Sequence, residues 1–305
     1  MQGRLKLGTR GSPLALAQAR KVAAAIESAQ RWPEGYVEIV KFTTTGDVVQ
    51  DRPLADVGGK GLWTKELDRA LIEGEVDFCV HSMKDVESVR PAELHIAAVR
   101  PRGDVRDRLI GADSLDELKQ GAVVGTSSPR RAAQLRRLRP DLKIVPIRGN
   151  VETRLAKVRS GKVDATLLAA AGLKRLDIDE GTAIPTETLL PAPGQAVIGI
   201  ESRTNDTMTQ SVLTTINNSL TYDCVMAERE FTRTLGGTCA SPIACLCVLE
   251  DGDLRMRAQI YSQDGSEMVE DRAVFDCGDL ETPAQLAKAM LAKAPDSMRR
   301  LFGAQ

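Results

Sequence analysis

The chain has 305 residues, of which 42% are hydrophobic and 27% charged, so it can bury the cores of two or three domains. Aromatic residues make up only 3%, which argues against a surface that stacks nucleic-acid bases. No stretch approaches the length of a membrane span, and the first residues, MQGRLKLGTRGSPLALAQ, lack the long apolar core of a signal peptide. We therefore expect a cytoplasmic protein.

The formal net charge of −1 conceals an uneven distribution. Between Arg100 and Arg175 there are 18 Lys and Arg against 8 Asp and Glu, whereas residues 201–305 contain 10 against 16. A basic middle suits nucleic acid and small polycarboxylates equally well, so charge alone leaves both kinds of ligand open.

The first predicted elements are a strand over RLKLGTR and an Ala-rich helix that runs to about Ser28. Ser12 followed by Pro13 predicts the start of this helix, because a serine hydroxyl caps free amides and proline suits the first helical position. The same pattern returns where the strand AVVGTSS leads into Ser128, Pro129 and the helix RRAAQLRRL.

Two further correspondences follow in the same order. The tripeptide Gly46-Asp47-Val48 matches Gly149-Asn150-Val151, and GEVDFCV (74–80) matches GKVDATL (161–167). Together the three matches predict two lobes of similar α/β architecture, the first with an insertion around ADVGGKGLW. Alternating strands and helices imply mostly parallel sheets, whose ligands lie beyond the carboxyl ends of the strands, so we expect a cleft between the lobes.

Polar stretches that contain Pro and Gly, over 99–104 and 189–203, predict two crossings between the lobes. The apolar strand in the second stretch is expected to return to the first lobe. After about Asn217 the pattern changes to a helix, strands broken at Asp251-Gly252 and Asp264-Gly265, and a final helix near Thr282. We therefore predict a first lobe over 1–99 and 196–217, a second over 100–195, and a small α+β domain with a three-stranded antiparallel sheet over 218–305.

The segment VHSMKD (80–85) ends a predicted strand in a cluster of polar groups, where α/β proteins place catalytic residues. Asp85 suits a proton donor or a counter-charge to a cation, and Ser82 and Lys84 suit the binding of an anion. His81 suits a base. The alternative is a solvated turn with a buried, hydrogen-bonded His81, because strand residues alternate faces.

The segment GTSSPRRAAQ (125–134) predicts an anion site, because a helix amino terminus offers unpaired N–H groups and partial positive charge. Arginines there oppose the helix dipole, which favours a bound anion over an exposed basic turn. Further cations follow strands in TRGS (9–12) and IRGNVETR (147–154), and AGLKRL adds Lys174 and Arg175, for which a surface charge pair is the alternative. The Gly-rich VGGKGLW lacks the spacing of a P-loop, and we interpret it as a mobile flap that carries Lys60.

Six cysteines in a chain without a secretion signal predict reduced thiols. Cys245 and Cys247 alternate within an apolar run and are expected on one face of a strand. No metal site is expected, since zinc favours a CxxC pair or several histidines and only two histidines are present. Cys239 lies in GGTCASPI, where glycines permit tight turns and make the thiol more accessible, although a lone cysteine is more often structural.

Seven motifs together resemble, in order and spacing, the porphobilinogen deaminase (hydroxymethylbilane synthase) family across nearly the whole chain: TRGSPLALAQ, GGKGLWTKEL, VHSMKDV, VGTSSPRRAAQL, IRGNVETRL, AAGLKRL and GGTCASP. The resemblance implies three α/β domains, the first two similar to type II periplasmic-binding-protein lobes. It also implies a transferase of tetrapyrrole and haem biosynthesis that condenses four porphobilinogen molecules, losing ammonia each time. Condensation would take place on a dipyrromethane cofactor joined by a thioether to Cys239, and water would then release hydroxymethylbilane.

The resemblance implies that Asp85 is catalytic. Its carboxylate would stabilise the cationic azafulvenium left when ammonia departs, and it would help to move protons. Cationic, hydroxyl and turn residues would bind the acetate and propionate groups of the pyrroles. The implied cofactor- and substrate-binding residues are Arg10, Ser12, Asp47, Lys60, Ser82, Lys84, Thr126, Ser127, Ser128, Arg130, Arg131, Arg148, Gly149, Asn150, Arg154, Arg175 and Gln195.

A few positions depart from the family's pattern. Asp56 stands where Lys is usual, Glu87 replaces a Pro after KDV, and Pro129 replaces an aliphatic residue. Ala196 and Thr238 stand where Gly is usual. None of these changes removes a residue with an implied catalytic role.

Two other functions stay open. A non-enzymatic two-lobed binding protein would explain the repeat, the cleft and the arginines, but not a third domain that presents a cysteine. A nucleic-acid-binding regulator is disfavoured because the basic stretch lacks interleaved aromatic residues. Since no large apolar stripe is left unassigned, we expect a monomer that binds porphobilinogen and neither nucleic acid nor membranes.

Overall fold

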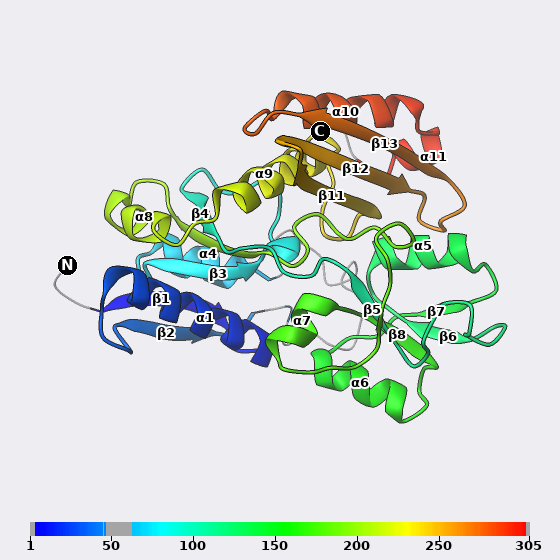
Figure 1. Cartoon of the computed structure of the whole chain (residues 1–305), viewed down its shortest axis with the longest axis horizontal. Helices are drawn as coiled ribbons and strands as arrows, with labels where there is room; N and C mark the ends of the chain where they lie inside the picture. Colours follow the sequence, from blue (N-terminus) through cyan, green and yellow to red (C-terminus); the bar gives the residue numbers. More distant parts are fainter. Residues whose placement is uncertain (1–3, 45, 47–62, 303–305) are drawn as a thin grey trace.

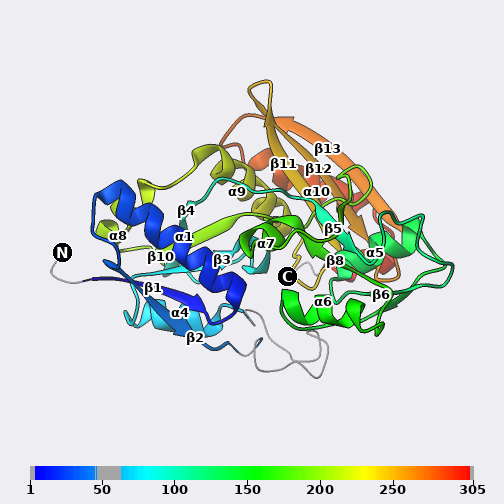
Figure 2. The same cartoon turned by 60° about the horizontal axis from the view of Figure 1, so that its bottom comes forward.

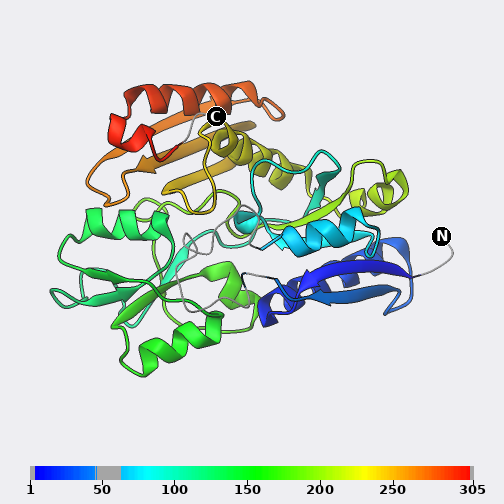
Figure 3. The ribbon, with the colours of Figure 1, turned by 180° about the vertical axis from the view of Figure 1, so that it is seen from behind.

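The computed structural model describes residues 4–44, 46 and 63–302, whose strands form three separate sheets (Figure 1). Two five-stranded sheets lie side by side, and the three-stranded sheet of the carboxyl-terminal part lies over the second of them, formed by residues 107–183, when the molecule is seen from the front or from behind (Figures 1 and 3). No helix within the described ranges is long and apolar enough to cross a membrane.

The first sheet is mixed. Its strands are β1 (Leu5–Arg10), β2 (Val37–Phe42), β3 (Phe78–Ser82), β4 (Leu94–Val99) and β10 (Ile198–Arg203). Their order is β2-β1-β3-β10-β4. Strand β1 pairs in parallel with β2 and β3, whereas β10 runs antiparallel to β3 and β4. The strand predicted to return to the first lobe therefore does so.

The second sheet repeats this plan. Its strands are β5 (Asp107–Ile110), β6 (Val123–Gly125), β7 (Lys143–Val145), β8 (Ala165–Ala169) and β9 (Thr182–Ala183). The order is β7-β6-β8-β5-β9, with β6 parallel to β7 and β8 and with β5 antiparallel to β8 and β9. The matching order and directions confirm the two similar lobes that the sequence repeat predicts.

The helices that follow β1 and β6 begin in the same way. Helix α1 (Pro13–Gln30) is capped by Ser12, whose Oγ accepts from the backbone N of Ala15 at 3.3 Å. Helix α5 (Pro129–Leu138) is capped by Ser128, whose Oγ accepts from the backbone N of Arg131 at 3.4 Å. Each helix has proline at its first position, as the Ser-Pro pairs predict.

The matching segments 74–80 and 161–167 also form equivalent turns and hydrogen bonds. Helices α4 (Lys65–Ile72) and α6 (Val151–Arg159) are each followed by a glycine in the left-handed region, Gly74 at φ 75° and Gly161 at φ 69°. Asp77 then accepts a hydrogen bond from the backbone N of Lys6 at 2.7 Å, and Asp164 accepts one from the backbone N of Val123 at 2.6 Å. These aspartates fix the start of β1 and β6 in equivalent ways.

Each lobe has its own apolar core. The core of the first lobe lies between its sheet, α1 and α8 (Thr207–Thr214), and includes Leu7, Ile26 and Phe78. That of the second lobe includes Leu109 and Leu135. The short helix α7 (Ala170–Arg175) follows β8 and contacts α1 of the other lobe.

The carboxyl-terminal part is a three-stranded antiparallel sheet packed on helices. Its elements are β11 (Ile243–Glu250), β12 (Asp253–Tyr261), β13 (Met268–Phe275), α9 (Ser219–Thr234), α10 (Glu281–Lys293) and α11 (Asp296–Arg299). Phe231, Met290 and Phe302 lie in its core together with Cys245 and Cys247, which share the buried face of β11 as predicted. Helix α9 contacts β4, and β11 and β12 contact α5, so this part touches both lobes. The predicted α/β fold class with three units is thus confirmed.

Candidate active site

One cleft collects most of the residues that the sequence singles out. It has a volume of about 830 Å³, within the range of small-molecule sites, and it is lined by residues at the carboxyl ends of β1, β3 and β8 and at the starts of α5 and α6. Figure 2 shows how these strands and helices are arranged. The predicted residues that line it are Arg10, Ser12, Ser82, Lys84, Asp85, Ser127, Ser128, Arg130, Arg131, Arg148, Gly149, Asn150, Arg154, Arg175, Gln195 and Cys239.

Among the predicted residues that the structure describes, Thr126 does not line the cleft. Thr126 is buried, and its hydroxyl accepts a hydrogen bond from the backbone N of Ser128 at 3.2 Å, so it shapes the turn before α5. Asp47 and Lys60 lie outside the described residues, as do Asp56 and most of the expected flap.

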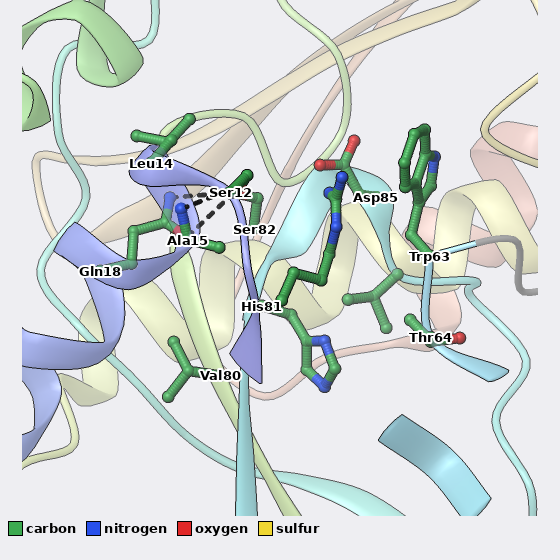
Figure 4. A pocket seen from close by; sticks show the side chains of 12 residues that line it. Ser12, Leu14, Ala15, Gln18, Trp63, Thr64, Val80, His81, Ser82 and Asp85 are labelled. Atoms are coloured by element: carbon green, nitrogen blue, oxygen red, sulfur yellow. Dashed lines mark hydrogen bonds between the residues drawn. The ribbon is translucent and has the colours of Figure 1, made fainter. Parts of the chain in front are cut away.

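The turn after β3 carries Asp85 into the cleft. Asp85 is the last residue of a short 3-10 turn (Met83–Asp85) whose first residue, Met83, is buried. The backbone N of Met83 donates to the carbonyl of Val197 at 3.0 Å, and its Sδ lies only 1.9 Å from the position that a Cβ on Gly199 would occupy. The Asp85 carboxylate and the Trp63 ring point to one side of the turn, whereas the ring of His81 points to the other (Figure 4).

Gly199→Ala should therefore disturb the turn that carries Asp85. The added methyl group collides with Met83, and overpacking of this kind costs about 1–3 kcal/mol in the free energy of unfolding. The urea concentration at the midpoint of unfolding and kcat should both be lower than in wild type. Gly172→Ala, where the nearest side-chain atom would be 3.6 Å away, is the control and should unfold no earlier than wild type. Equal stability of the Gly199 variant and wild type would show that Met83 does not anchor the turn.

Trp63 is a cleft residue that the sequence analysis did not single out. The guanidinium carbon of Arg10 lies 4.1 Å from the centroid of its ring, which is a cation–π contact. Both residues line the cleft beside Asp85. The tryptophan at the end of VGGKGLW was the available signal, but no spacing in that motif indicated which strand end the ring would reach.

Burial lowers the pKa values of several cations of the cleft, Arg130 among them. Removal from water lowers the pKa of Lys84 to about 8 and the pKa values of Arg154 and Arg175 to about 10. The Nε of Arg154 donates to the carbonyl of Gly149 at 3.0 Å, and Nη2 of Arg175 donates to the carbonyl of Ala196 at 2.6 Å. A buried cation that is bound only to neutral carbonyl groups is stabilised when an anion binds beside it. This region therefore suits a ligand with several carboxylates.

Arg130 and Arg131 already share a buried carboxylate. Asp107 lies 2.8 Å from Nη2 of Arg130 and 2.7 Å from Nη2 of Arg131, and all three side chains are buried. Burial raises the pKa of Asp107, but the two guanidinium groups outweigh it and hold this pKa well below its usual range. Gln195 joins the same network, because its Nε2 donates to Asp107 at 3.0 Å and to the carbonyl of Val105 at 2.7 Å. Because Arg130, Arg131 and Gln195 already bind Asp107, only some of their hydrogen-bond donors are left for a ligand in the cleft.

The turn before α6 is built around its predicted residues. Gly149 adopts φ 111°, which favours glycine, and the Oδ1 of Asn150 caps the helix by accepting from the backbone N of Thr153 at 2.9 Å. Nη2 of Arg148 lies 3.5 Å from the carbonyl of Gly46, which brings together the two segments that match in the repeat.

Cys239 presents its thiol in the loop between α9 and β11. It is exposed, whereas Cys245 and Cys247 are buried, so the predicted difference in accessibility is confirmed. The loop is closed by a hydrogen bond from the backbone N of Thr238 to Oγ of Ser241 at 3.0 Å. Partial removal from water, together with the carboxylates of Glu87 and Asp85, raises the pKa of Cys239 to about 12.

His81 belongs to a buried network beneath the cleft. Its Nε2 lies 3.2 Å from Oε2 of Glu201, whose Oε1 accepts from Nε of Arg90 at 2.7 Å. Burial raises the pKa of Glu201, but hydrogen bonds from His81 and Arg90 lower it to about 2. Of the two interpretations of His81, the structure favours the buried one, and the sequence analysis missed Glu201 and Arg90. No cluster of three metal-binding side chains occurs among the residues that the structure describes.

The chain matches two family models that together span most of its length. Residues 5–211 match "Porphobilinogen deaminase, dipyromethane cofactor binding domain", and residues 222–295 match "Porphobilinogen deaminase, C-terminal domain". The chain belongs to the porphobilinogen deaminase family. A porphobilinogen deaminase of Sphingopyxis alaskensis is 51% identical over 98% of this chain and 96% of that protein. One of Paracoccus denitrificans is 44% identical over 96% of each chain.

The chain also resembles solved structures at lower identity. The periplasmic VFT2 domain of Bordetella pertussis BvgS is 17% identical, with a TM-score of 0.40, over 74% of this chain and 89% of that one. The periplasmic aliphatic sulphonate binding protein SsuA from Escherichia coli is 16% identical, with a TM-score of 0.38, over 77% and 71% of the two chains.

The family matches confirm the predicted membership, the transferase activity and the dipyrromethane cofactor. The residues present fit this cofactor on their own geometry. An exposed thiol and a candidate catalytic carboxylate line the same cleft, and beside them lie Arg154 and Arg175, whose guanidinium groups donate to backbone carbonyls.

The departure from the family pattern at Ala196 has a visible consequence. Ala196 adopts φ 70°, the left-handed region that favours glycine and that costs an alanine about 1 kcal/mol. Its carbonyl accepts hydrogen bonds from Gly103 at 3.2 Å and from Arg175, so the strained residue lies where the two crossings between the lobes meet. Pro129, by contrast, occupies the first position of α5 and fits without strain.

Proposed function

We propose that this cleft carries out the reaction of the porphobilinogen deaminase family, with the dipyrromethane cofactor attached to Cys239. Four porphobilinogen units would be joined with loss of ammonia at each step, and water would release hydroxymethylbilane. When bound, the dipyrromethane supplies the pyrrole carbon to which the first unit is joined. The observation that carries this proposal is the meeting of Asp85, Cys239 and the buried cations in one cleft.

Asp85 would act on the charge that develops at the substrate. Departure of ammonia from porphobilinogen leaves a positive charge spread over the pyrrole ring and its N–H group. A fixed carboxylate at the cleft wall stabilises that charge and accepts the proton that is lost when the new bond forms. The anchored turn from Met83 to Asp85 keeps this carboxylate in place during each addition.

The cations would hold the acetate and propionate groups. Lys84, Arg154 and Arg175 are among the cleft cations whose charge is disfavoured by burial, so each gains from a bound carboxylate. The remaining predicted ligands, Arg10, Ser12, Asp47, Lys60, Ser82, Thr126, Ser127, Ser128, Arg130, Arg131, Arg148, Gly149, Asn150 and Gln195, stay proposals. Among these, Thr126 would act through the turn that it shapes.

Binding of substrate should weaken as Lys84 loses its proton. Its pKa of about 8 lies below the usual value of 10.5, so about nine-tenths of its charge is present at pH 7 and about one-tenth at pH 9. We expect KM for porphobilinogen to rise by up to about tenfold between these pH values. In Lys84→Arg, whose guanidinium stays charged, the rise should be absent. An equal rise in the arginine variant would assign the pH dependence to another group.

The proposal is tested by incubating the purified chain with porphobilinogen and following ammonia and tetrapyrrole together. We expect one ammonia for each porphobilinogen consumed and one linear tetrapyrrole for each four. Binding of porphobilinogen without release of ammonia would contradict the proposal and would favour the two-lobed binding protein.

We also propose the predicted division into 1–99 with 196–217, 100–195 and 218–305, which agrees with the membership of the three sheets. A cytoplasmic monomer without a nucleic-acid partner is likewise a proposal. It is supported by the burial of Arg130 and Arg131 against Asp107 and by the scatter of the exposed large hydrophobic residues over separate elements. Light scattering and retention on DNA at low salt test these two points.

A further inference from the structure

Glu87 lies beside the thiol that is proposed to hold the cofactor. The Sγ of Cys239 donates a long hydrogen bond to Oε1 of Glu87 at 4.0 Å, across 152 positions of the sequence. Both residues also line a small cavity of about 70 Å³ that shares Lys84, Ser128 and other residues with the cleft, and that has room for water.

The main chain at Glu87 is held by the carboxyl-terminal part. Arg229 of α9 donates to the carbonyls of Val86 at 3.2 Å, Glu87 at 2.7 Å and Ser88 at 3.3 Å. These bonds use main-chain oxygens and not the Glu87 carboxylate. A change confined to the side chain of Glu87 therefore leaves the anchor of the turn intact.

Burial, together with the carboxylates of Glu87 and Asp85, makes the thiol of Cys239 difficult to deprotonate. Lys84, Glu87, Arg130 and Arg229 line the small cavity, and Asp85 lies on the adjoining turn. With a pKa of about 12, Cys239 is almost entirely protonated at neutral pH. A thiol in this state forms a carbon–sulfur bond efficiently only when a base takes its proton.

We propose that Glu87 is the base that accepts the thiol proton when Cys239 forms its thioether. The inference rests on the proposed attachment at Cys239. In this step the bond from Sγ to the methylene carbon of an aminomethylpyrrole forms, and the carbon–nitrogen bond breaks with its electron pair leaving on ammonia. The thiol proton moves to Oε1 of Glu87 and then to solvent, so the step needs no oxidant or reductant.

The test uses the full chain, produced in cells that cannot make porphobilinogen. Wild type, Glu87→Gln, Glu87→Asp and the control Glu93→Gln, an exposed residue remote from the cleft lining, are compared. The intact mass is followed over time after addition of porphobilinogen. In a second measurement without porphobilinogen, the rate at which iodoacetamide alkylates Cys239 is determined by peptide mass at pH 8.

The two measurements should change in opposite directions. Loss of the base should slow the gain of mass in Glu87→Gln by about tenfold or more. Loss of the negative charge should lower the pKa of the thiol and make alkylation of Cys239 severalfold faster. Glu87→Asp, which keeps a carboxylate, should gain mass faster than Glu87→Gln, and Glu93→Gln should match wild type in both measurements.

Three results would overturn the inference. Gain of mass by Glu87→Gln at the wild-type rate would remove the role of a base. A fall in both rates would show that the substitution only closes or distorts the Cys239 loop. Failure of wild type itself to gain mass would refute the attachment at Cys239 and with it the proposed function. The behaviour of wild type therefore distinguishes a failure of the proposed function from a failure of the inference about Glu87.

Discussion

Asp85→Asn should lower kcat by about 10²- to 10⁴-fold while leaving the fold and the covalently bound mass unchanged. Asparagine has the shape of aspartate, and the turn that carries it is set by Met83, Gly199 and the carbonyl of Val197 rather than by the carboxylate. The substitution removes only the negative charge and the capacity to accept a proton. Steady-state turnover of porphobilinogen and the intact mass of the purified variant test both halves of this expectation.

Asp113→Asn is the matched control, because Asp113 is an exposed aspartate of the second lobe away from the cleft lining. It should turn over porphobilinogen at the wild-type rate. Turnover by Asp85→Asn within a few-fold of wild type would remove Asp85 from its proposed role and leave the chemistry to another group.

Asp107→Asn should destabilise the chain by about 3–5 kcal/mol, the usual cost of removing one partner from a buried ion pair. Two guanidinium groups, those of Arg130 and Arg131, would be left buried without their shared counter-charge. Chemical denaturation near pH 7 measures this loss. Because the same network includes Gln195 and the start of α5, KM for porphobilinogen should rise as well.

The contribution of Asp107 should depend on pH in a defined direction. Its pKa is held well below the usual value, so its contribution is complete above the unfolded value of about 4 and is lost as the pH falls toward the folded one. The difference in stability between wild type and Asp107→Asn should therefore shrink as the pH is lowered from 5 to 3.

Asp179→Asn provides the comparison for Asp107. Asp179 also pairs with an arginine in the second lobe, Arg108 at 2.8 Å, but its side chain is 95% exposed. Removal of this pair should cost no more than about 1 kcal/mol. Similar losses for the two variants would mean that the buried position of Asp107 has no special energetic role.

The features that the sequence predicts well are local ones. Ser12-Pro13 and Ser128-Pro129 start helices because the cap and the proline act within a few residues, and both caps are present. The repeat extends this local information to the fold, since the same strands, turns and helices must pack in the same order. For the same reason the strand ends that carry Arg10, Asp85 and Arg148 reach one cleft.

The features that the sequence could not show depend on contacts between distant segments. Nothing around Asp107 indicates that its carboxylate lies between two arginines more than 20 positions away. Glu201 meets His81 only because β10 returns beside β3. Glu87 reaches Cys239 only because the carboxyl-terminal part folds against the turn after β3. Residue type and spacing singled out the candidate ligands, but their partners within the fold required the structure.

The most direct test of the account is the intact mass of the purified chain under denaturing conditions, measured beside Cys239→Ser. We expect wild type to be heavier than its sequence by two linked pyrrole units and the variant to match its bare sequence. If both proteins match their bare sequences, even after incubation with porphobilinogen, the attachment at Cys239 is wrong. The two-lobed binding protein would then be the better explanation of the cleft.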